Sequence, residues 1–174
     1  MYAYYLAEAR METQHDIPMA LRAAYLSMHR QTNAHVERYG ITADQFVLMV
    51  LLSEEDGITQ QQLVRKADSD PNTVRAMLIL LEKRGHISRD RHPTDGRARR
   101  VTLTRKGRQV LTRSVCRTQV VRNRMLDLFT ARELSALARY LSRISNSLSE
   151  SNSPRTQIRP KATAFRRPAR KNHS

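Results

Sequence analysis

The stretch from Asp70 to Thr104 constrains the fold of this chain more than any other part of the sequence. It opens with Asp-Pro, a pair typical of a helix start, because the carboxylate caps the first turn and proline suits the first helical position. The helical pattern ends at Gly85, and two strand-like segments, 86–90 and 99–103, follow around an Asp-Gly turn. Five arginines lie in this hairpin, at positions 89, 91, 97, 99 and 100. A basic hairpin beside a helix suits the binding of a phosphate backbone and offers little for covalent chemistry.

A second short helix is predicted just before this stretch. Thr59-Gln-Gln-Gln62 forms a capping box, in which the threonine oxygen accepts a backbone N–H and the glutamine side chain returns to the threonine N–H. Apolar residues follow at helical spacing, and a turn over residues 68–70 leads into the next helix. Two helices joined by a tight turn form a helix-turn-helix, and the basic hairpin after it makes a winged helix. The expected fold class is therefore mainly α with a small β-hairpin wing.

This arrangement predicts an interface with double-stranded DNA. A helix N-terminus can enter the major groove, while arginines at a hairpin tip can enter the minor groove or pair with phosphates. Val74, Leu78 and Leu81 form the core side of the second helix, so its other face is left for the groove; the alternative is a merely solvated helix face. The predicted DNA-binding residues are Gln60, Gln61, Asn72, Thr73, Arg75, Ala76, Ile79, Arg89, Arg91, Arg97, Arg99 and Arg100.

Further helices are predicted on both sides of the winged helix. One spans about Ile17–Arg38, with Pro18 in its first turn and Gly40 as its stop. Threonines that can cap the starts of later helices stand at positions 42, 104 and 130. Apolar residues recur at three- and four-residue steps on the first and last helices, and on the last they form a helix-packing seam. They are Leu21, Tyr25 and Met28 on the first, and Leu134, Leu137, Leu141, Ile144 and Leu148 on the last.

The hairpin and its flanks resemble the MarR family of bacterial regulators, whose wing carries D-x-R followed by L-T-x-x-G. The matching residues are Asp95, Arg97, Leu103, Thr104 and Gly107, and the likeness extends over residues 17–148. It implies a homodimer through helices within 17–40 and 105–148, with a winged helix-turn-helix at 42–104 between them. It also implies that Arg97 enters the minor groove, while Asp95 and Gly96 hold the wing in shape.

Four residues depart from the family pattern. Ala76 and Ile79-Leu80 stand on the recognition helix where polar or charged residues are common. Base readout would then depend on Asn72 and its neighbours, together with apolar contact to thymine methyl groups. His86 takes a place usually filled by an apolar residue, and a partly exposed strand histidine is expected there, with a pH or metal role as the alternative.

The charge of the chain favours a polyanionic partner. Its 31 Lys and Arg residues against 16 Asp and Glu give a net charge of +15. An N-terminal extension is predicted over 1–16. A tail over 149–174 is predicted to be disordered. After Glu150 the tail carries seven basic residues and no acid, and up to Glu150 the chain has 24 basic residues against 16 acidic ones. It is either an arm that adds phosphate contacts or an extension that raises solubility.

Composition also excludes several classes. The single cysteine, Cys116, rules out an internal disulfide framework and suits a reducing cytoplasm; the residue is either incidental or redox-active. No run approaches the roughly 18 apolar residues of a membrane span, and the N-terminus lacks the order of a secretory signal. No cofactor, metal site or enzymatic motif is predicted, although a metal site shared between subunits stays an alternative.

The sequence therefore predicts a cytoplasmic, nucleoid-associated transcriptional regulator. Its expected action is repression, as a homodimer on a pseudo-palindromic DNA operator, and the family resemblance adds a small aromatic effector that relieves it. Two alternatives remain. One is a basic nucleoid-associated or RNA-binding protein with little sequence specificity, and the other is a redox or metal sensor of the same fold.

Overall fold

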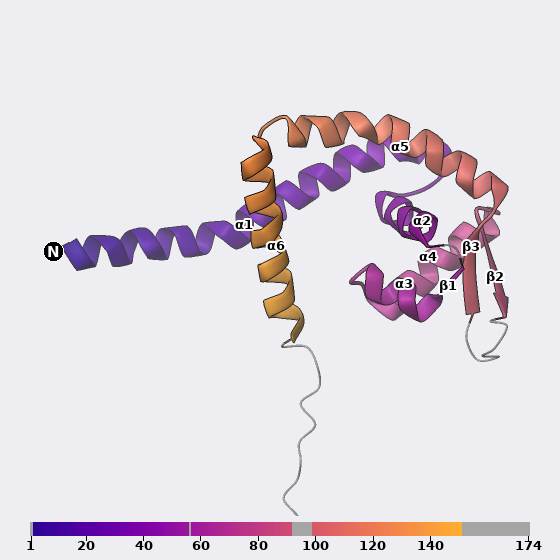
Figure 1. The fold of residues 1–174 in the computed structure, drawn as a ribbon, viewed down its shortest axis with the longest axis horizontal. Helices are drawn as coiled ribbons and strands as arrows, with labels where there is room; N and C mark the ends of the chain where they lie inside the picture. The colour runs from indigo at the N-terminus through magenta and orange to yellow at the C-terminus, as the bar shows by residue number, and fades with distance from the viewer. Residues whose placement is uncertain (1, 56, 92–98, 151–174) are drawn as a thin grey trace, which may run out of the picture. The chain divides into compact units, whose positions relative to one another are not determined.

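The computed structural model describes residues 2–55, 57–91 and 99–150 (Figure 1). The chain forms two compact units, Met1–Leu128 and Phe129–Ser174, and each is described by itself. No helix in the described residues is long and apolar enough to cross a membrane. The first unit holds α1 Tyr2–Val36, η1 Glu37–Tyr39 (a 3-10 helix), α2 Ala43–Glu54, β1 Ile58–Thr59, α3 Gln60–Lys66, α4 Pro71–Lys83, β2 Ile87–Arg91, β3 Arg99–Leu103 and α5 Arg105–Leu126; the second holds α6 Ala131–Glu150.

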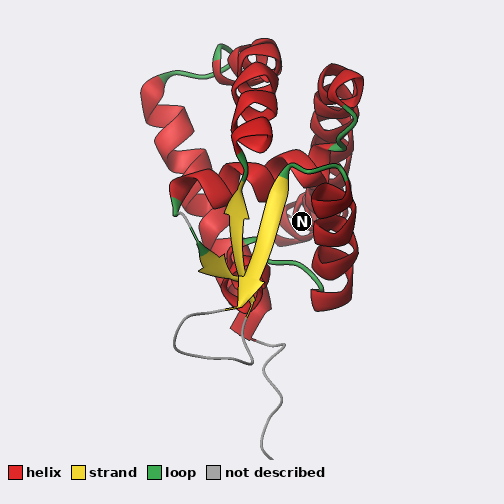
Figure 2. Cartoon of the chain, turned by 90° about the vertical axis from the view of Figure 1, so that its right-hand side faces the viewer, coloured by secondary structure: helices red, strands yellow, loops and turns green. Residues whose placement is uncertain are grey.

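The predicted fold class is confirmed, because one small sheet accompanies helices throughout the described chain (Figure 2). The sheet has the order β1-β3-β2 and is antiparallel. Ile87 pairs with Leu103 at the closed end of the β2–β3 pair, and Arg91 pairs with Arg99 at the end nearest the hairpin turn. Strand β1 was not predicted, since two residues are too few to show an alternating pattern.

The polar residues that were predicted to start helices do so. Thr42 and Thr59 both form complete capping boxes, with Gln45 and Gln62 as their partners. Thr104 caps α5 by accepting the amide of the third helical residue, and the Thr130 amide donates to the carboxylate of Glu133, a distance of 2.8 Å. A side-chain oxygen at each of these positions satisfies a backbone N–H that would otherwise lack a partner.

The predicted start of the first helix was wrong. Helix α1 begins at Tyr2 and runs through Pro18, which was expected to lie in the first turn. Proline removes only one donor of the helical ladder, and Ala, Leu, Glu, Met, Arg and Gln, which are strong helix formers, fill the segment before it. The propensity of that segment outweighs the local cost of the proline. The predicted stop is confirmed, since Gly40 adopts a left-handed conformation after η1 with φ 72°.

The core of the first unit is aliphatic, as the composition indicated. Most of its buried side chains come from α2, α3, α4 and the sheet, with further ones from the end of α1 and from α5, so the core fixes the two helices of the helix-turn-helix against the hairpin strands. Helix α4 buries Val74, Leu78 and Leu81, which were predicted to face the core. The remaining buried aliphatic side chains are Val36, Ile41, Leu48, Met49, Leu52, Ile58, Leu63, Ile87, Val101, Leu103 and Leu111.

The boundary predicted for the C-terminal tail also shifts. Helix α6 continues to Glu150, two residues beyond the predicted end at Leu148. Residues 151–174 lie outside the described part of the chain, and so does most of the segment predicted to be a disordered basic tail.

Candidate nucleic-acid interface

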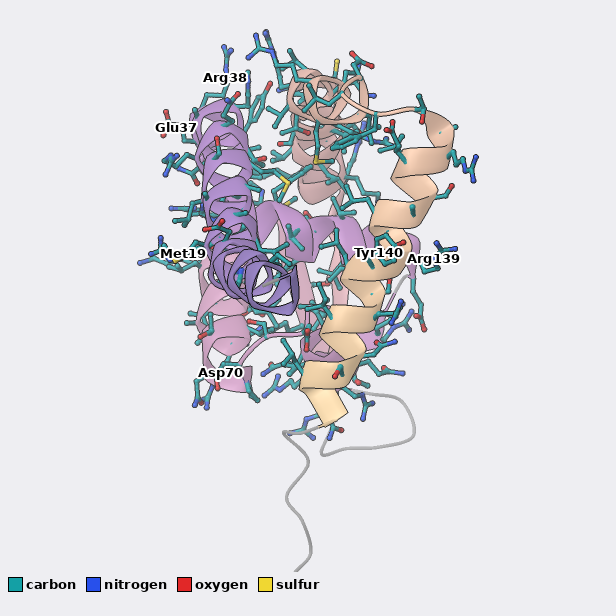
Figure 3. All side chains as sticks on the ribbon, turned by 90° about the vertical axis from the view of Figure 1, so that its left-hand side faces the viewer. Met19, Glu37, Arg38, Asp70, Arg139 and Tyr140 are labelled. Atoms are coloured by element: carbon teal, nitrogen blue, oxygen red, sulfur yellow. The ribbon has the colours of Figure 1, made fainter. Side chains whose placement is uncertain are left out.

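The start of α4 is fixed by its N-cap residue Asp70, which is labelled in Figure 3. One of its carboxylate oxygens accepts the amide N–H of Asn72 at 2.9 Å and that of Thr73 at 3.0 Å. Pro71 occupies the first helical position and has no N–H to satisfy. The amide groups of the first turn are therefore occupied, and the side chains of Asn72 and Thr73, both exposed, are what this end presents to a ligand.

The exposed face of α4 is opposite to its buried stripe. Asn72, Ala76 and Ile79 are spaced by four and three residues, so they lie on one side of the helix and all are exposed. Arg75 is exposed beside this stripe. The structure therefore brings the five residues predicted on this helix, including Thr73, to one open surface.

Helix α3 packs against α4 and supplies the other predicted helical pair. Gln61 is exposed and Gln60 is half-buried at the first turn of α3. The turn between the helices uses Asp68 in a left-handed conformation with φ 46°, which aspartate tolerates better than most residues. The tight turn explains how two such short helices remain in contact.

Arg91 and Arg99 place two positive charges opposite each other on the hairpin strands. They are direct cross-strand partners at the open end of the β2–β3 ladder, and both are exposed. Like charges directly opposite on antiparallel strands destabilise the pairing. A polyanion bound at this end would offset that repulsion, so the pair is suited to a phosphate backbone.

Arg89 of β2 forms an ion pair with Glu82 of α4. Its Nε donates to a carboxylate oxygen of Glu82 at 2.9 Å and its terminal nitrogen donates to the same oxygen. This bond holds the pKa of the Glu82 carboxyl below its usual value, and the charge of Arg99 lowers that pKa as well, while burial acts in the opposite direction. Arg89 therefore joins the wing strand to the recognition helix, a contact that was not predicted.

The remaining predicted wing residues differ in position. Arg100 is half-buried, and its guanidinium lies against Gly57, where an added Cβ would overlap it. Glycine is also required there by its φ of 76°. Arg97, Asp95 and Gly96 lie outside the described residues, so their predicted roles stay predictions.

A network of hydrogen bonds supports the hairpin at its closed end, and sequence reasoning identified only part of it. Thr104 donates its hydroxyl to the carbonyl of Gly85 at 2.7 Å, and its amide donates to the carbonyl of His86 at 3.0 Å. Lys106 donates to the carbonyl of Arg84 at 2.7 Å. The L-T-x-x-G segment could have pointed to this network, because its threonine and glycine both lie against the chain after α4.

His86 corrects another prediction, because it is buried with 3% exposure rather than partly exposed. Burial lowers the pKa of its imidazole, and the positive charges of Lys106 and Arg84 lower it further. The family pattern places an apolar residue at this position, and the structure buries the histidine there.

The residues predicted for the dimer interface are exposed or half-buried apolar side chains on two separate helices. On α1, Leu21, Tyr25 and Met28 are between 37% and 52% exposed. On α6, Leu134 is half-buried and the other four are exposed, namely Leu137, Leu141, Ile144 and Leu148. Arg139 lies next to Tyr140 on the same helix (Figure 3), with its guanidinium 5.4 Å from the ring centroid. Apolar helix faces of this extent are typical of surfaces that pack against another protein.

The geometry defines a winged helix-turn-helix protein, in which α3 and α4 precede a basic two-stranded wing. Comparison with known proteins agrees with this class. A model of the MarR family matches residues 41–98. The transcriptional regulator HosA of Escherichia coli O111:H- is 31% identical over 103 residues, which cover 56% of this chain and 76% of that protein. The transcriptional repressor Rv2887 of Mycobacterium tuberculosis is 27% identical over 114 residues, covering 66% and 82%.

Solved structures share the same fold. The Staphylococcus aureus MepR–DNA complex matches with a TM-score of 0.70 at 20% identity, covering 75% of this chain and 96% of that one. The chain belongs to the MarR family, whose members are transcriptional regulators and not enzymes.

Proposed function

We propose that this chain is a transcriptional repressor that binds a pseudo-palindromic DNA operator as a homodimer, in the cytoplasm on nucleoid DNA. The observation that carries the proposal is the exposed Arg91–Arg99 pair beside the open face of α4. The pair offers two positive charges to a phosphate backbone, and the helix offers side chains to a groove. Arg97, with Asp95 and Gly96 as its support, completes the wing in this proposal.

Repression and dimerisation are supported by different observations. Rv2887 is named a repressor, and the MepR structure contains DNA. The exposed apolar faces of α1 and α6 supply surfaces for a second copy of the chain. A dimer with two recognition helices on one face of DNA implies half-sites about one helical turn apart, near 10 base pairs.

An effector forms the second part of the proposal. The family resemblance implies a small aromatic acid or phenol. Such a ligand would release DNA only if it binds more tightly to an arrangement of the two winged helix-turn-helix parts that differs from the DNA-bound arrangement. Titration of a panel of such compounds into the protein–operator complex tests this part. Release by none of them would remove the effector and leave a constitutive repressor.

The central experiment selects bound duplexes from a random DNA pool. A recovered palindrome with half-sites about 10 base pairs apart supports the dimeric operator model. Equal affinity for the selected and random duplexes over a range of salt concentrations would instead support the basic protein of low specificity. Unchanged DNA affinity with peroxide, chelator and added zinc would remove the redox or metal sensor.

Two variants test the wing directly. The double variant Arg91→Ala, Arg99→Ala should lower affinity for the selected duplex and reduce the slope of log affinity against log salt by about 2. Arg97→Ala should weaken binding without unfolding the dimer. Arg22→Ala, which removes one positive charge from α1 at an exposed position, serves as the control for charge alone. An effect of Arg22→Ala as large as that of Arg97→Ala would contradict the assignment of the wing.

A further inference from the structure

The recognition helix presents an apolar surface at the centre of its exposed face. Ile79 is 44% exposed and Leu80 is 46% exposed, although both belong to the helix that the proposed function places in the major groove. Ala76 lies one turn before them on the same side as Ile79. Asn72 stands at the start of this stripe, Lys83 at the last residue of the helix, and Arg75 beside the stripe.

We propose that this helix selects DNA half-sites by the 5-methyl groups of thymine, through Ile79 and Ala76. This inference rests on the proposed function and names the bases that the recognition helix selects. Among the four bases only thymine presents a methyl group in the major groove; the other edges there present hydrogen-bond donors and acceptors. An aliphatic side chain packed on cytosine or guanine would leave the donors and acceptors of that base without a hydrogen-bond partner. Such a side chain therefore favours thymine and disfavours cytosine and guanine.

The spacing of the residues fits two neighbouring base pairs. Three residues of helix separate Ala76 from Ile79, a rise of about 4.5 Å. Successive base pairs are about 3.4 Å apart, so the two side chains can meet adjacent thymines when the helix lies in the groove. Asn72, one turn before Ala76, is left to pair with the N6 and N7 edge of an adenine. The expected half-site therefore contains adjacent thymines preceded by an adenine contact.

The charges around the patch favour DNA over an apolar protein as its occupant. Arg75 and Lys83 flank the stripe, and both are exposed. Arg91 and Arg99 add two exposed positive charges on the adjoining wing, where Arg89 bonds to Glu82 of the same helix. An apolar protein surface would leave these charges uncompensated, whereas a duplex supplies phosphates on both sides of a groove lined by methyl groups.

Replacement of thymine by deoxyuridine tests the inference, because it removes the 5-methyl group and keeps the base pairing. The duplex selected from the random pool is the probe, and each thymine of a half-site is replaced in turn. The protein should lose about four-fold in affinity for each methyl group that Ile79 or Ala76 covers, as expected for the burial of one methylene-sized group. Replacement in both half-sites should lose about the square of that factor.

A variant of the protein shows whether Ile79 is the residue that senses the methyl group. Ile79→Ala should bind the deoxyuridine and thymine duplexes almost equally at the position that Ile79 covers. The substitution changes an exposed side chain to a better helix former, so the fold should be retained. Val47→Ala, at a residue of α2 that is 48% exposed, is the matched control and should keep the full loss.

The outcomes separate this inference from the proposed function. If the protein selects a palindrome but binds the deoxyuridine duplexes as tightly as the thymine ones, thymine recognition is overturned and the operator model stands. A selected half-site without adjacent thymines, or a loss that Ile79→Ala retains in full, overturns it as well. Failure to select any sequence overturns both proposals.

Discussion

Gly107 of α5 lies against the backbone of the segment after α4, and replacing it with alanine should destabilise the protein. A Cβ on residue 107 would overlap the carbonyl oxygen of His86 and lie 2.9 Å from its carbonyl carbon. Neither atom ends a flexible side chain, so the backbone must move. The same carbonyl accepts the amide of Thr104 at 3.0 Å, and the movement would stretch that hydrogen bond.

Three contributions set the expected size of the effect. Alanine is favoured over glycine within a helix by about 1 kcal/mol, which acts in favour of the variant. Overpacking costs about 1–3 kcal/mol, and the loss of one net hydrogen bond costs about 1 kcal/mol. The free energy of unfolding should therefore fall by about 2 kcal/mol. For a chain of this size the melting temperature should fall by about 4–8 °C.

Urea unfolding followed by circular dichroism measures this difference at one fixed protein concentration, since assembly would otherwise change the apparent stability. Gly85→Ala is the comparator. Its φ is 71° and nothing lies within 4 Å of the added Cβ, so it measures backbone strain alone, about 1 kcal/mol. A Gly107→Ala protein as stable as the parent would refute the argument that contact with His86 requires glycine.

Four further outcomes are expected. The native pKa of His86 lies below its ordinary value of 6.5. The contribution of His86 to stability is therefore complete above pH 6.5 and is lost as the pH falls through its native pKa. In the His86→Leu variant, the free energy of unfolding measured with urea should change less between pH 6.5 and that native pKa. The pKa of Glu82 is also lowered, from 4.5, so its contribution to stability is lost as the pH falls below 4.5 through its native pKa. Glu82→Gln should flatten the dependence of stability on pH only in that more acidic range. Leu141→Asp should yield a monomer in sedimentation and abolish tight operator binding; a persisting dimer would contradict the seam. Deleting 151–174 should lower the salt slope of DNA affinity by as much as about 6, which is about 0.9 for each of its seven basic residues, while base preference is retained.

The sequence predicted the starts of the helices after α1 well, because a cap is a contact between near neighbours. Thr42 and Thr59 bond to residues three positions away, and the pattern of residue types is visible without any tertiary information. The outward face of α4 was predictable for a similar reason, since burial of Val74 and Leu78 follows from the helical period.

The contacts that the sequence did not predict all join separate elements. The ion pair between Arg89 and Glu82 depends on how the wing packs on α4, and charge patterning alone assigned that arginine to DNA. His86 was expected at a strand surface, but the hydrogen bonds around Thr104 bring α5 over it. The continuation of α1 through Pro18 was missed because a local breaker was given more weight than the helix formers before it.

Arg84 couples the end of the recognition helix α4 to two other parts of the fold. Its guanidinium donates to the carbonyl of Gly40, where the first helical segment ends, and its own carbonyl accepts a hydrogen bond from Lys106 of α5. The residue caps the C-terminus of α4. A displacement of the α1 terminus must therefore break the bond to Gly40 or carry the recognition helix with it. Arg84 therefore links the end of α1 directly to the recognition helix, in addition to the packing of α1 on α2 and α5.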